Sequence, residues 1–140
     1  MKVSGEMTPN PATVSPDDSI RHAAALMRQL NVGVLPVCDD DRLVGIVTDR
    51  DITVRATALG SPPDSTNVSE VLTEPVRYLA ECSDIEEAVE LMRAAHIRRV
   101  PIVNGDNRLI GILSLSDLAI NGERGAAEVL QEISQAGFKH

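Results

Sequence analysis

Two copies of one sequence pattern make up most of this chain of 140 residues. Val3-Ser4 begins the first copy, and Val68-Ser69, 65 residues later, begins the second. The same spacing relates six further positions: Ile20, Ala23, Leu26, Met27, Arg28 and Pro36 return as Ile85, Ala88, Leu91, Met92, Arg93 and Pro101. After one extra residue in a turn, the segment Arg42–Ile46 returns as Arg108–Ile112. A repeat of this length predicts two similar units, each too small for a good core, packed on each other about a pseudo-twofold axis.

Composition favours one compact protein with an aliphatic core. A unit of about 55 residues buries only about 60% of the surface that its unfolded chain exposes, and pairing two units raises the fraction to about 70%. Hydrophobic residues make up 43% of the chain, yet Trp is absent and Tyr78 and Phe138 are its only aromatic residues. The net charge of −8 repels phosphate backbones and anionic lipid surfaces, and side chains that could stack on bases are scarce. We therefore expect neither a nucleic acid nor a membrane as partner.

The termini and the cysteines indicate a cytoplasmic protein. The sequence has no apolar run of the ~18 residues needed to span a bilayer, and Met1–Glu6 lacks the apolar stretch of a signal peptide. Cys38 and Cys82 occupy non-equivalent positions in the two copies and lack CxxC spacing. Free thiols in a reducing cytosol are the favoured interpretation, and a disulfide is the alternative.

The strongest periodic signal in each copy predicts a helix. Apolar residues recur with helical spacing at Ile20, Ala23, Ala24, Met27 and Leu30, and again at Ile85, Ala88, Val89, Met92 and Ala95. Asp17 and Asp18 mark the start of the first helix. For the second helix, we expect Ser83 to cap the first turn and Glu86 to complete a capping box.

Two short apolar runs around a turn follow each helix and predict a β-hairpin. The runs and turns are Val34–Val37, Asp39–Asp41 and Leu43–Val47, and then Val100–Val103, Asn104–Asn107 and Leu109–Leu113. Their near-continuous apolar character predicts strands that are covered on both faces. Pro36 and Pro101 lack a backbone donor and favour an edge or strand-start position. Thr13-Val14 and Tyr78-Leu79 predict one more short strand before each helix.

The remaining segments complete a mixed α/β (α+β) fold with β-α-β-β-α order in each repeat. A second helix is expected after each hairpin, roughly at residues 49–59 and 116–121. The glycine and two prolines of Gly60–Ser65 predict a linker. Gly125–Gly137 predicts a final amphipathic helix without a counterpart in the first repeat, which either covers the module or contacts another chain. The predicted organisation is repeat 1 at residues 3–60, a linker at 61–67, repeat 2 at 68–122 and a helical tail at 123–140.

The segment that could carry chemistry is Gly45–Asp51, which returns as Gly111–Asp117. In both copies a strand runs into a helix start, and a hydroxyl residue precedes a carboxylate by three positions. One interpretation is a capping box, in which the hydroxyl and the acid satisfy backbone donors. The other is nucleotide binding, because a helix N-terminus attracts phosphate and a carboxylate one turn later can accept hydrogen bonds from two ribose hydroxyls. The pattern alone leaves both interpretations open.

The chain from Val3 to Asn121 resembles a tandem pair of cystathionine β-synthase (CBS) domains, a Bateman module. The resemblance rests on the duplicated β-α-β-β-α order, on Val34–Val37 and Val100–Val103, and on two Gly-h-h-Thr/Ser-x-x-Asp segments, where h is apolar. It implies paired repeats whose clefts bind an adenosine-containing ligand: AMP, ADP, ATP, S-adenosylmethionine or NAD. It also implies that the motif Asp contacts ribose hydroxyls, that the motif Ser or Thr contacts phosphate, and that a basic residue before the second strand neutralises phosphate.

Carried over to this sequence, the implied ligand set is complete in the second repeat. It consists of a basic pair, two serines and the acid: Arg98, Arg99, Ser114, Ser116 and Asp117. Arg99 is the better phosphate candidate, because a guanidinium can bind two phosphate oxygens at once. The first repeat keeps Thr48, Arg50 and Asp51, but Gly33 and Val34 stand in place of the arginines, so its site is expected to be weak or empty. A solvated pair at a strand entrance is the alternative for the two arginines.

These observations predict a stand-alone, non-catalytic regulatory module that requires no cofactor and binds an adenine nucleotide or S-adenosylmethionine as its regulatory ligand. The resemblance implies a homodimer and an effector protein that receives the signal. The alternative is a ligand-free dimeric scaffold or stress-related interaction module. An enzyme comes third, because neither a GxSxG elbow nor a GxxxxGK[ST] loop is present. The histidines and cysteines lack metal-ligand spacing, so no metal site is expected.

Overall fold

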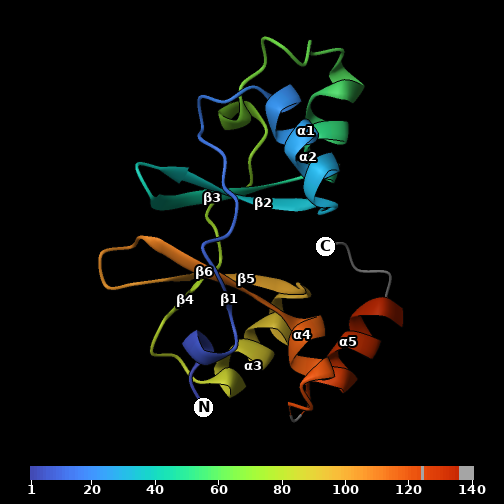
Figure 1. Ribbon diagram of the computed structural model, residues 1–140. Coiled ribbons are helices and arrows are strands. Elements are labelled where there is room, and N and C mark those ends of the chain that lie inside the picture. The colour runs from blue at the N-terminus through green and yellow to red at the C-terminus, as the bar shows by residue number, and fades with distance from the viewer. Residues whose placement is uncertain (124, 136–140) are drawn as a thin grey trace. The chain divides into compact units, whose positions relative to one another are not determined.

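The computed structural model describes residues 1–123 and 125–135, and the chain forms two compact units (Figure 1). Unit 2 is Ala12–Val76, and unit 1 combines Met1–Pro11 with the described part of Arg77–His140. Each unit therefore contains the helices and hairpin of one repeat together with the opening segment of the other. Since the opening segments are copies of each other, Val3 enters the core of unit 1 at the place that Val68 takes in unit 2.

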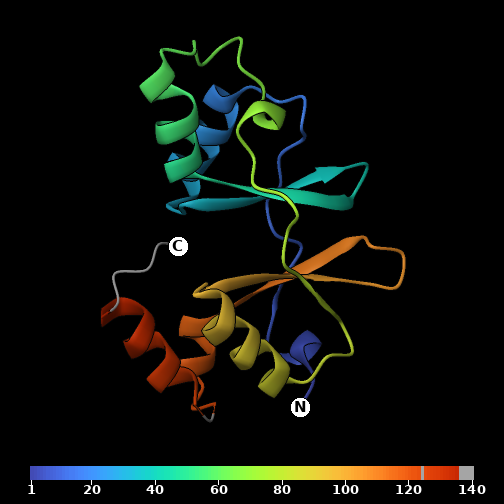
Figure 2. The same ribbon diagram turned by 180° about the vertical axis from the view of Figure 1, so that it is seen from behind.

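Unit 2 consists of a two-stranded sheet with helices on one of its faces (Figures 1 and 2). Its elements are α1 (Ile20–Leu30), β2 (Val34–Asp39), β3 (Arg42–Thr48), α2 (Asp49–Arg55), and the 3-10 helices η2 (Thr57–Leu59) and η3 (Val68–Glu70). β2 and β3 are antiparallel, and Val14 adds an isolated parallel bridge to Val37. The second helix of this repeat ends four residues before the predicted Leu59, and a 3-10 turn takes its place.

Unit 1 has the same plan with a larger sheet and one more helix. Its elements are η1 (Val3–Gly5), β1 (Thr8–Pro9), β4 (Leu79–Ala80), α3 (Ile85–Ala95), β5 (Arg99–Val103), β6 (Leu109–Ser114), α4 (Leu115–Ile120) and α5 (Ala126–Gln135). The strand order is β1-β6-β5-β4, in which β5 and β6 are antiparallel and β4 lies parallel to β5. The opening segment of the chain supplies the edge strand β1, which is antiparallel to β6.

The first turns of α1 and α3 are capped differently. Ser19 caps α1 by accepting a hydrogen bond from the backbone N–H of His22 at 3.1 Å. The predicted cap of α3 by Ser83 is wrong, because the N-cap residue is Asp84 and its side chain makes no capping bond. The Asp84 carboxylate instead accepts a hydrogen bond from Lys2 Nζ at 3.1 Å, and this bond raises the pKa of Lys2. The opening segment thus engages the acid that would otherwise be free to cap the helix.

The two hairpins form as predicted, and their turns use residues with positive φ. Asp40 and Asp41 have φ values of 51° and 68°, and Asn107 has a φ of 61°. β2 and β5 each bury four successive residues, as expected for strands covered on both faces, whereas buried and half-buried residues alternate along β3. Pro101 was expected at an edge or a strand start, but it lies inside the inner strand β5. It is tolerated there because β4 pairs only with the two residues that follow it.

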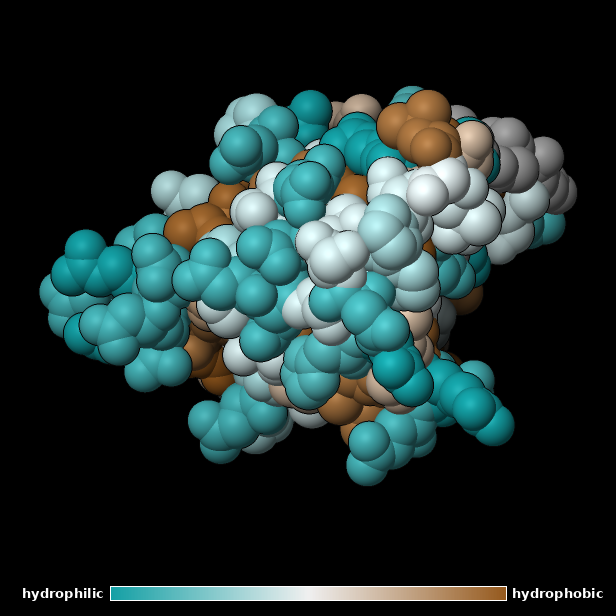
Figure 3. All heavy atoms as spheres, turned by 90° about the horizontal axis from the view of Figure 1, so that it is seen from above, coloured by the Kyte–Doolittle hydropathy of each residue, from teal (hydrophilic) through white to brown (hydrophobic). Residues whose placement is uncertain are grey.

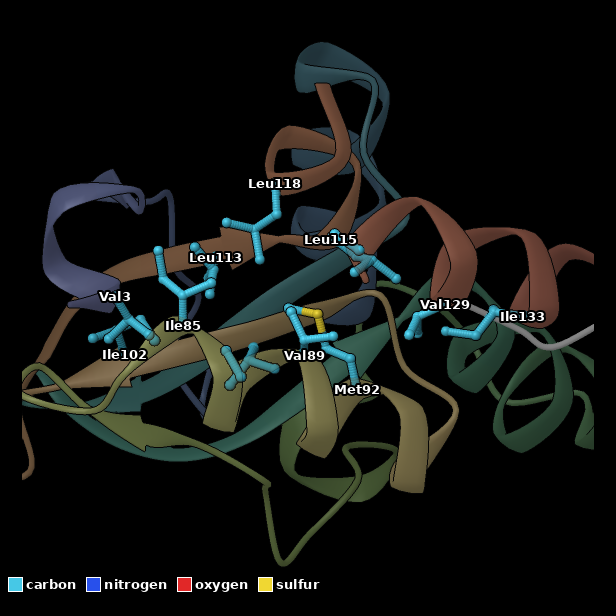
Figure 4. Close-up of a cluster of buried hydrophobic side chains, with 13 residues drawn as sticks. Val3, Ile85, Val89, Met92, Ile102, Leu113, Leu115, Leu118, Val129 and Ile133 are labelled. Carbon is cyan, nitrogen blue, oxygen red and sulfur yellow. The ribbon is translucent and has the colours of Figure 1, made fainter. Parts of the chain in front are cut away.

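The final helix α5 packs on its own unit. Ala126, Val129 and Ile133 are at most 1% exposed and join side chains of α3 and α4 in one cluster (Figure 4). Of the two expected roles, covering the module is therefore the one that the structure shows for this helix. The predicted end of the helix at Gly137 lies outside the described residues.

The face of the molecule in Figure 3 is largely hydrophilic. Figure 3 shows one face of the molecule, on which hydrophobic residues form small, separate patches. Val54 of α2 and Ile120 of α4 occupy equivalent positions in the two repeats, and both are exposed. None of the helices in residues 1–123 and 125–135 is long and apolar enough to cross a bilayer.

Candidate functional site

Backbone pairing at the corner between β6 and α4 joins the two segments that carry all five residues predicted for the second repeat. Ser114 ends β6 and is the N-cap residue of α4. Arg99 is the partner of Ser114 in the β5–β6 register, so the two side chains leave the same face of the sheet. The backbone N–H of Leu115 donates to the carbonyl of Arg98 at 2.8 Å, which ties the arginine loop to the start of the helix. Asp117 follows in the first turn of α4.

The hydroxyl and the acid of this corner are not used by the fold. Ser114 makes no side-chain cap of α4. Within the part of the chain that the structure describes, the side chains of Ser114, Ser116 and Asp117 make no hydrogen bond or ion pair. Both serines are half-buried, and Asp117 is exposed. The corner therefore offers two hydroxyls and a carboxylate whose hydrogen-bonding capacity is available to a ligand.

The arginine loop adds positive charge and an unsatisfied donor. Arg98 is half-buried, and its Nε is shielded from solvent without a hydrogen-bond partner among the described residues. Leaving a buried donor unpaired costs about 1–3 kcal/mol, so such a group gains when an acceptor arrives. Arg99 is exposed next to it. A guanidinium presents several N–H groups in one plane, an arrangement that suits phosphate or carboxylate oxygens.

The equivalent corner in the first repeat has the same backbone geometry. Thr48 ends β3 and is the N-cap residue of α2, and it pairs with Val34 as Ser114 pairs with Arg99. The N–H of Asp49 donates to the carbonyl of Gly33 at 2.9 Å, which matches the bond at the other corner. Neither Gly33 nor Val34 supplies a charge. The two corners therefore differ as predicted: the second has two arginines at these positions, and the first has none.

The side chains of the first repeat's corner are engaged within unit 2. Thr48 Oγ1 accepts a hydrogen bond from the N–H of Asp51 at 3.0 Å, and Asp51 Oδ2 accepts one from the N–H of Thr48 at 3.0 Å. Thr73 Oγ1 lies 3.3 Å from both carboxylate oxygens of Asp51, and Arg55 Nε lies 3.9 Å from Oδ1. Asp51 is only 9% exposed. The capping-box interpretation is therefore confirmed for the first repeat, whereas the hydroxyl and acid of the second repeat make no such box.

Thr73 also belongs to the corner, and this role was not predicted from the sequence. It lies in the opening segment of the second repeat, 22 residues away from Asp51 along the chain. Its backbone also pairs with Ile46 of β3 through two hydrogen bonds, of 2.8 and 3.2 Å. The signal in the sequence is Gly45, where a Cβ would lie 2.9 Å from the carbonyl oxygen of Thr73. Gly111 has the same relation to Thr8, so the motif glycines make room for the opening segments.

The remaining candidates stay apart. Arg50 is exposed on α2, and its backbone N–H donates to Asp49 Oδ1 at 2.8 Å. Among residues 1–123 and 125–135, no three His, Cys, Asp or Glu side chains gather closely enough to hold a metal ion. Both cysteines are free thiols, as predicted. Cys38 is buried, and desolvation with a smaller effect of Asp41 raises the pKa of its thiol to about 11.

Comparison with known protein families and sequences identifies similar proteins. The family model described as the CBS domain matches residues 3–56 and 68–121. The CBS domain-containing protein YhcV of Bacillus subtilis is 43% identical over 134 residues, which cover 94% of this chain and 94% of that protein. The two matched ranges coincide with the two copies found in the sequence.

Solved structures give the same picture. Hypoxic Response Protein I with two coordinated zinc ions has a TM-score of 0.79 and 32% identity, covering 86% of this chain and 98% of that one. CBSX2 in complex with AMP has a TM-score of 0.76 and 30% identity, covering 86% of this chain and 95% of that one. Both structures therefore match most of this chain in fold and in sequence.

Proposed function

The chain belongs to the CBS-domain family, and from this premise we propose that it is a regulatory module that binds an adenosine-containing ligand at the β6–α4 corner of unit 1. The observation that carries the proposal is the contrast between the equivalent acids in the two copies of the motif. Asp51 is buried and hydrogen-bonded within its own unit, whereas Asp117 is exposed and makes no interaction with the described residues. The AMP bound to the similar protein CBSX2 supports a nucleotide as the ligand.

Each residue of the corner has a role in the proposal. Arg99 and Arg98 bind phosphate oxygens, and the unpaired Nε of Arg98 gains an acceptor. Ser114 and Ser116 donate their hydroxyl protons to the phosphate. Asp117 accepts hydrogen bonds from the two ribose hydroxyls. Every group binds and none acts as a nucleophile or base, so the proposal contains no catalytic step.

The proposal includes a second, weaker site formed by Thr48, Arg50 and Asp51. A ligand there would have to displace the hydrogen bonds that Thr48 and Thr73 make with Asp51. Breaking the bonds of a buried carboxylate costs about 1–3 kcal/mol, which weakens binding by roughly tenfold to a hundredfold. We therefore expect one ligand per chain at concentrations that saturate the corner of unit 1.

Isothermal titration calorimetry with AMP, ATP and S-adenosylmethionine tests the proposal. Arg99→Ala and Asp117→Ala each remove a charge-assisted hydrogen bond worth about 1.5–3 kcal/mol, so affinity should fall at least about tenfold. Arg42→Ala is the matched control, because Arg42 is an exposed arginine at the tip of the first hairpin. Its affinity should stay within about twofold of the wild type. No binding of any of the three ligands at millimolar concentration would refute the proposal.

Self-association and an effector protein remain part of the proposed function. The proposed module catalyses no reaction. Ligand binding can therefore affect another protein only through direct contacts with that chain. Ligand binding changes such contacts only if the ligand prefers one packing state over another. Sedimentation velocity with and without AMP measures whether the expected homodimer forms and responds. A monomer under both conditions would remove the dimer from the proposal.

A further inference from the structure

The turn of the β5–β6 hairpin contains one of the two Asn-Gly pairs in the chain. The pairs are Asn104-Gly105 in this turn and Asn121-Gly122 directly after α4. Asparagine is chemically labile before glycine, because no side chain hinders attack of the glycine nitrogen on the side-chain amide carbon. The two pairs have different surroundings in the structure, so we expect them to react at different rates.

The reacting nitrogens of the pair Asn104-Gly105 are not engaged by the fold. The N–H of Gly105 donates no hydrogen bond to any residue that the structure describes. Gly105 is exposed, and no atom lies within 4 Å of the place where its Cβ would be, so hydroxide can reach the nitrogen. Nδ2 of Asn104, which leaves as ammonia in the reaction, also has no hydrogen-bond partner among the described residues.

Two backbone N–H groups lie at the oxygen on which negative charge develops. Asn104 Oδ1 accepts a hydrogen bond from the N–H of Asp106 at 2.9 Å and another from the N–H of Arg108 at 3.1 Å. This oxygen becomes an oxyanion when the Gly105 nitrogen attacks the amide carbon. Donors that are already in place at such an oxygen lower the barrier of the reaction.

The pair Asn121-Gly122 lacks these features. The N–H of Gly122 donates to the carbonyl of Ala119 at 3.2 Å, so the attacking nitrogen is engaged. Asn121 Nδ2 donates to Glu6 Oε2 at 3.0 Å, which holds the nitrogen that would have to leave. No described residue donates a hydrogen bond to the Asn121 side-chain oxygen. The fold therefore protects Asn121 and leaves Asn104 reactive.

We propose that Asn104 is a site of spontaneous deamidation in the folded protein. The Gly105 nitrogen gives its proton to hydroxide and forms a bond to the side-chain carbon of Asn104. The bond from this carbon to Nδ2 then breaks, and ammonia leaves with a proton taken from water. The resulting succinimide ring adds water at either of its carbonyls, which gives aspartate or isoaspartate. Water and hydroxide are the only co-reactants.

The two products affect the hairpin differently. Aspartate keeps an oxygen for both N–H groups of the turn, and Asp39 occupies the equivalent position in the first hairpin. Isoaspartate adds one carbon to the backbone of the turn, where the Asn104 N–H donates to the carbonyl of Arg108 at 3.0 Å. The turn helps to fix the register of β5 and β6, so the isoaspartate form should exchange the amide hydrogens of these strands faster.

Incubation of the full chain at pH 8 in heavy-oxygen water, followed by peptide mass spectrometry, measures deamidation at each asparagine. Asn104 should react at least about tenfold faster than Asn121 in the folded chain. In concentrated urea the two should react at similar rates, because both then have only glycine as a neighbour on that side and no fold around them. This comparison separates the effect of the structure from that of the sequence.

Gly105→Ala is the variant that tests the attacking nitrogen. Its Cβ hinders the attack, so deamidation of Asn104 should slow about tenfold. Space is available for this Cβ, so the variant keeps the fold, which circular dichroism checks. Asn104→Asp represents the aspartate product and should exchange its amide hydrogens as the wild type does, whereas the isoaspartate form, separated by ion exchange, should exchange them faster.

Three results overturn the proposal. The first is deamidation of Asn121 in the folded chain that is as fast as that of Asn104. The second is an Asn104 that reacts in urea and stays intact in the folded chain, because the turn would then protect it. The third is a rate at Asn104 that Gly105→Ala leaves unchanged.

Discussion

The β3–α2 corner of unit 2 and the β6–α4 corner of unit 1 share a sequence pattern and a backbone geometry, and they differ in what the carboxylate does. Asp51 takes part in a capping box and contacts Thr73, and it is 9% exposed. Asp117 is exposed and makes no side-chain interaction with the described residues. The two copies of the motif thus differ: in the first, the hydroxyl and the acid stabilise the helix start, and in the second they make no such bonds.

The contrast extends to the residues around each acid. Arg55 lies near Asp51 and donates to the carbonyls of Val71 and Leu72, which holds the opening segment against the corner. At the other corner, the positive charges of Arg98 and Arg99 stand at the entrance of β5 and are not tied to Asp117. Charges that are satisfied internally stabilise a fold, whereas charges that are left unsatisfied favour a ligand of opposite charge.

The largest effect on stability is expected at the motif glycines. In Gly45→Ala the new Cβ would lie 2.9 Å from the backbone carbonyl of Thr73, which cannot move freely, so we expect a loss of about 2–3 kcal/mol. In Gly111→Ala the new Cβ meets the side chain of Met7 and lies 3.0 Å from the backbone carbonyl of Thr8, so a similar loss of about 2–3 kcal/mol is expected. Urea unfolding at equilibrium measures both values.

Gly105→Ala is the control for this pair, because no atom lies within 4 Å of its added Cβ. Its stability should stay within about 0.5 kcal/mol of the wild type. Equal losses at Gly45 and Gly105 would show that the opening segment does not press on the corner as described.

Substitutions of the two N-cap residues are expected to change stability less than those of the motif glycines. Thr48→Ala removes the acceptor for the Asp51 N–H and should cost about 1 kcal/mol. Ser114→Ala removes a hydroxyl that does not cap α4, so its cost should stay below about 0.5 kcal/mol. The same urea titration measures both variants. If Ser114→Ala cost as much as Thr48→Ala, the second corner would use its hydroxyl for folding, and the contrast would be lost.

The cysteines distinguish the interior of unit 2 from the surface of unit 1. A thiol reagent at pH 8 should modify the exposed Cys82 first and the buried Cys38 far more slowly, since its thiol has a pKa of about 11. Mass spectrometry after timed quenching measures the two rates. Equal rates would contradict the burial of Cys38.

The raised pKa of Cys38 also predicts a pH dependence. In the unfolded chain the thiol ionises near its ordinary value of 9.0, and in the folded chain near 11. The folded state therefore keeps its proton where the unfolded state loses it. The contribution to stability is fully present below pH 9 and is lost as the pH rises through 11, by about 1–2 kcal/mol. Cys38→Ala should remove this part of the pH dependence.

Much of the fold was predictable because it depends on local pattern. The apolar spacing of the two long helices and the turn residues of the hairpins determine those elements within a residue or two. The cap of α3 was placed one residue too early, at Ser83. The N-cap residue is Asp84, and its carboxylate bonds to Lys2, which is distant in the sequence. Local rules cannot anticipate a partner that arrives from another segment.

The candidate site divides in the same way. The repeat register identified Arg98, Arg99, Ser114, Ser116 and Asp117. The β5–β6 register pairs Arg99 with Ser114, and the N–H of Leu115 bonds to the carbonyl of Arg98. Both motifs have the pattern hydroxyl-x-x-Asp. The sequence therefore could not predict that one acid is buried and hydrogen-bonded while the other is exposed. The difference arises from side-chain contacts: Thr73 contacts Asp51, whereas its counterpart Thr8 makes no side-chain hydrogen bond with Asp117.

Thermal unfolding of Asp51→Asn and Asp117→Asn, each with and without AMP, tests the central claim most directly. Asp51→Asn should lower the ligand-free Tm by about 4–8 °C, equivalent to about 2 kcal/mol, and should keep the stabilisation that AMP adds. Asp117→Asn should keep the ligand-free Tm and lose the stabilisation by AMP. The opposite assignment, or the same behaviour of both variants, would contradict the division of roles between the two corners.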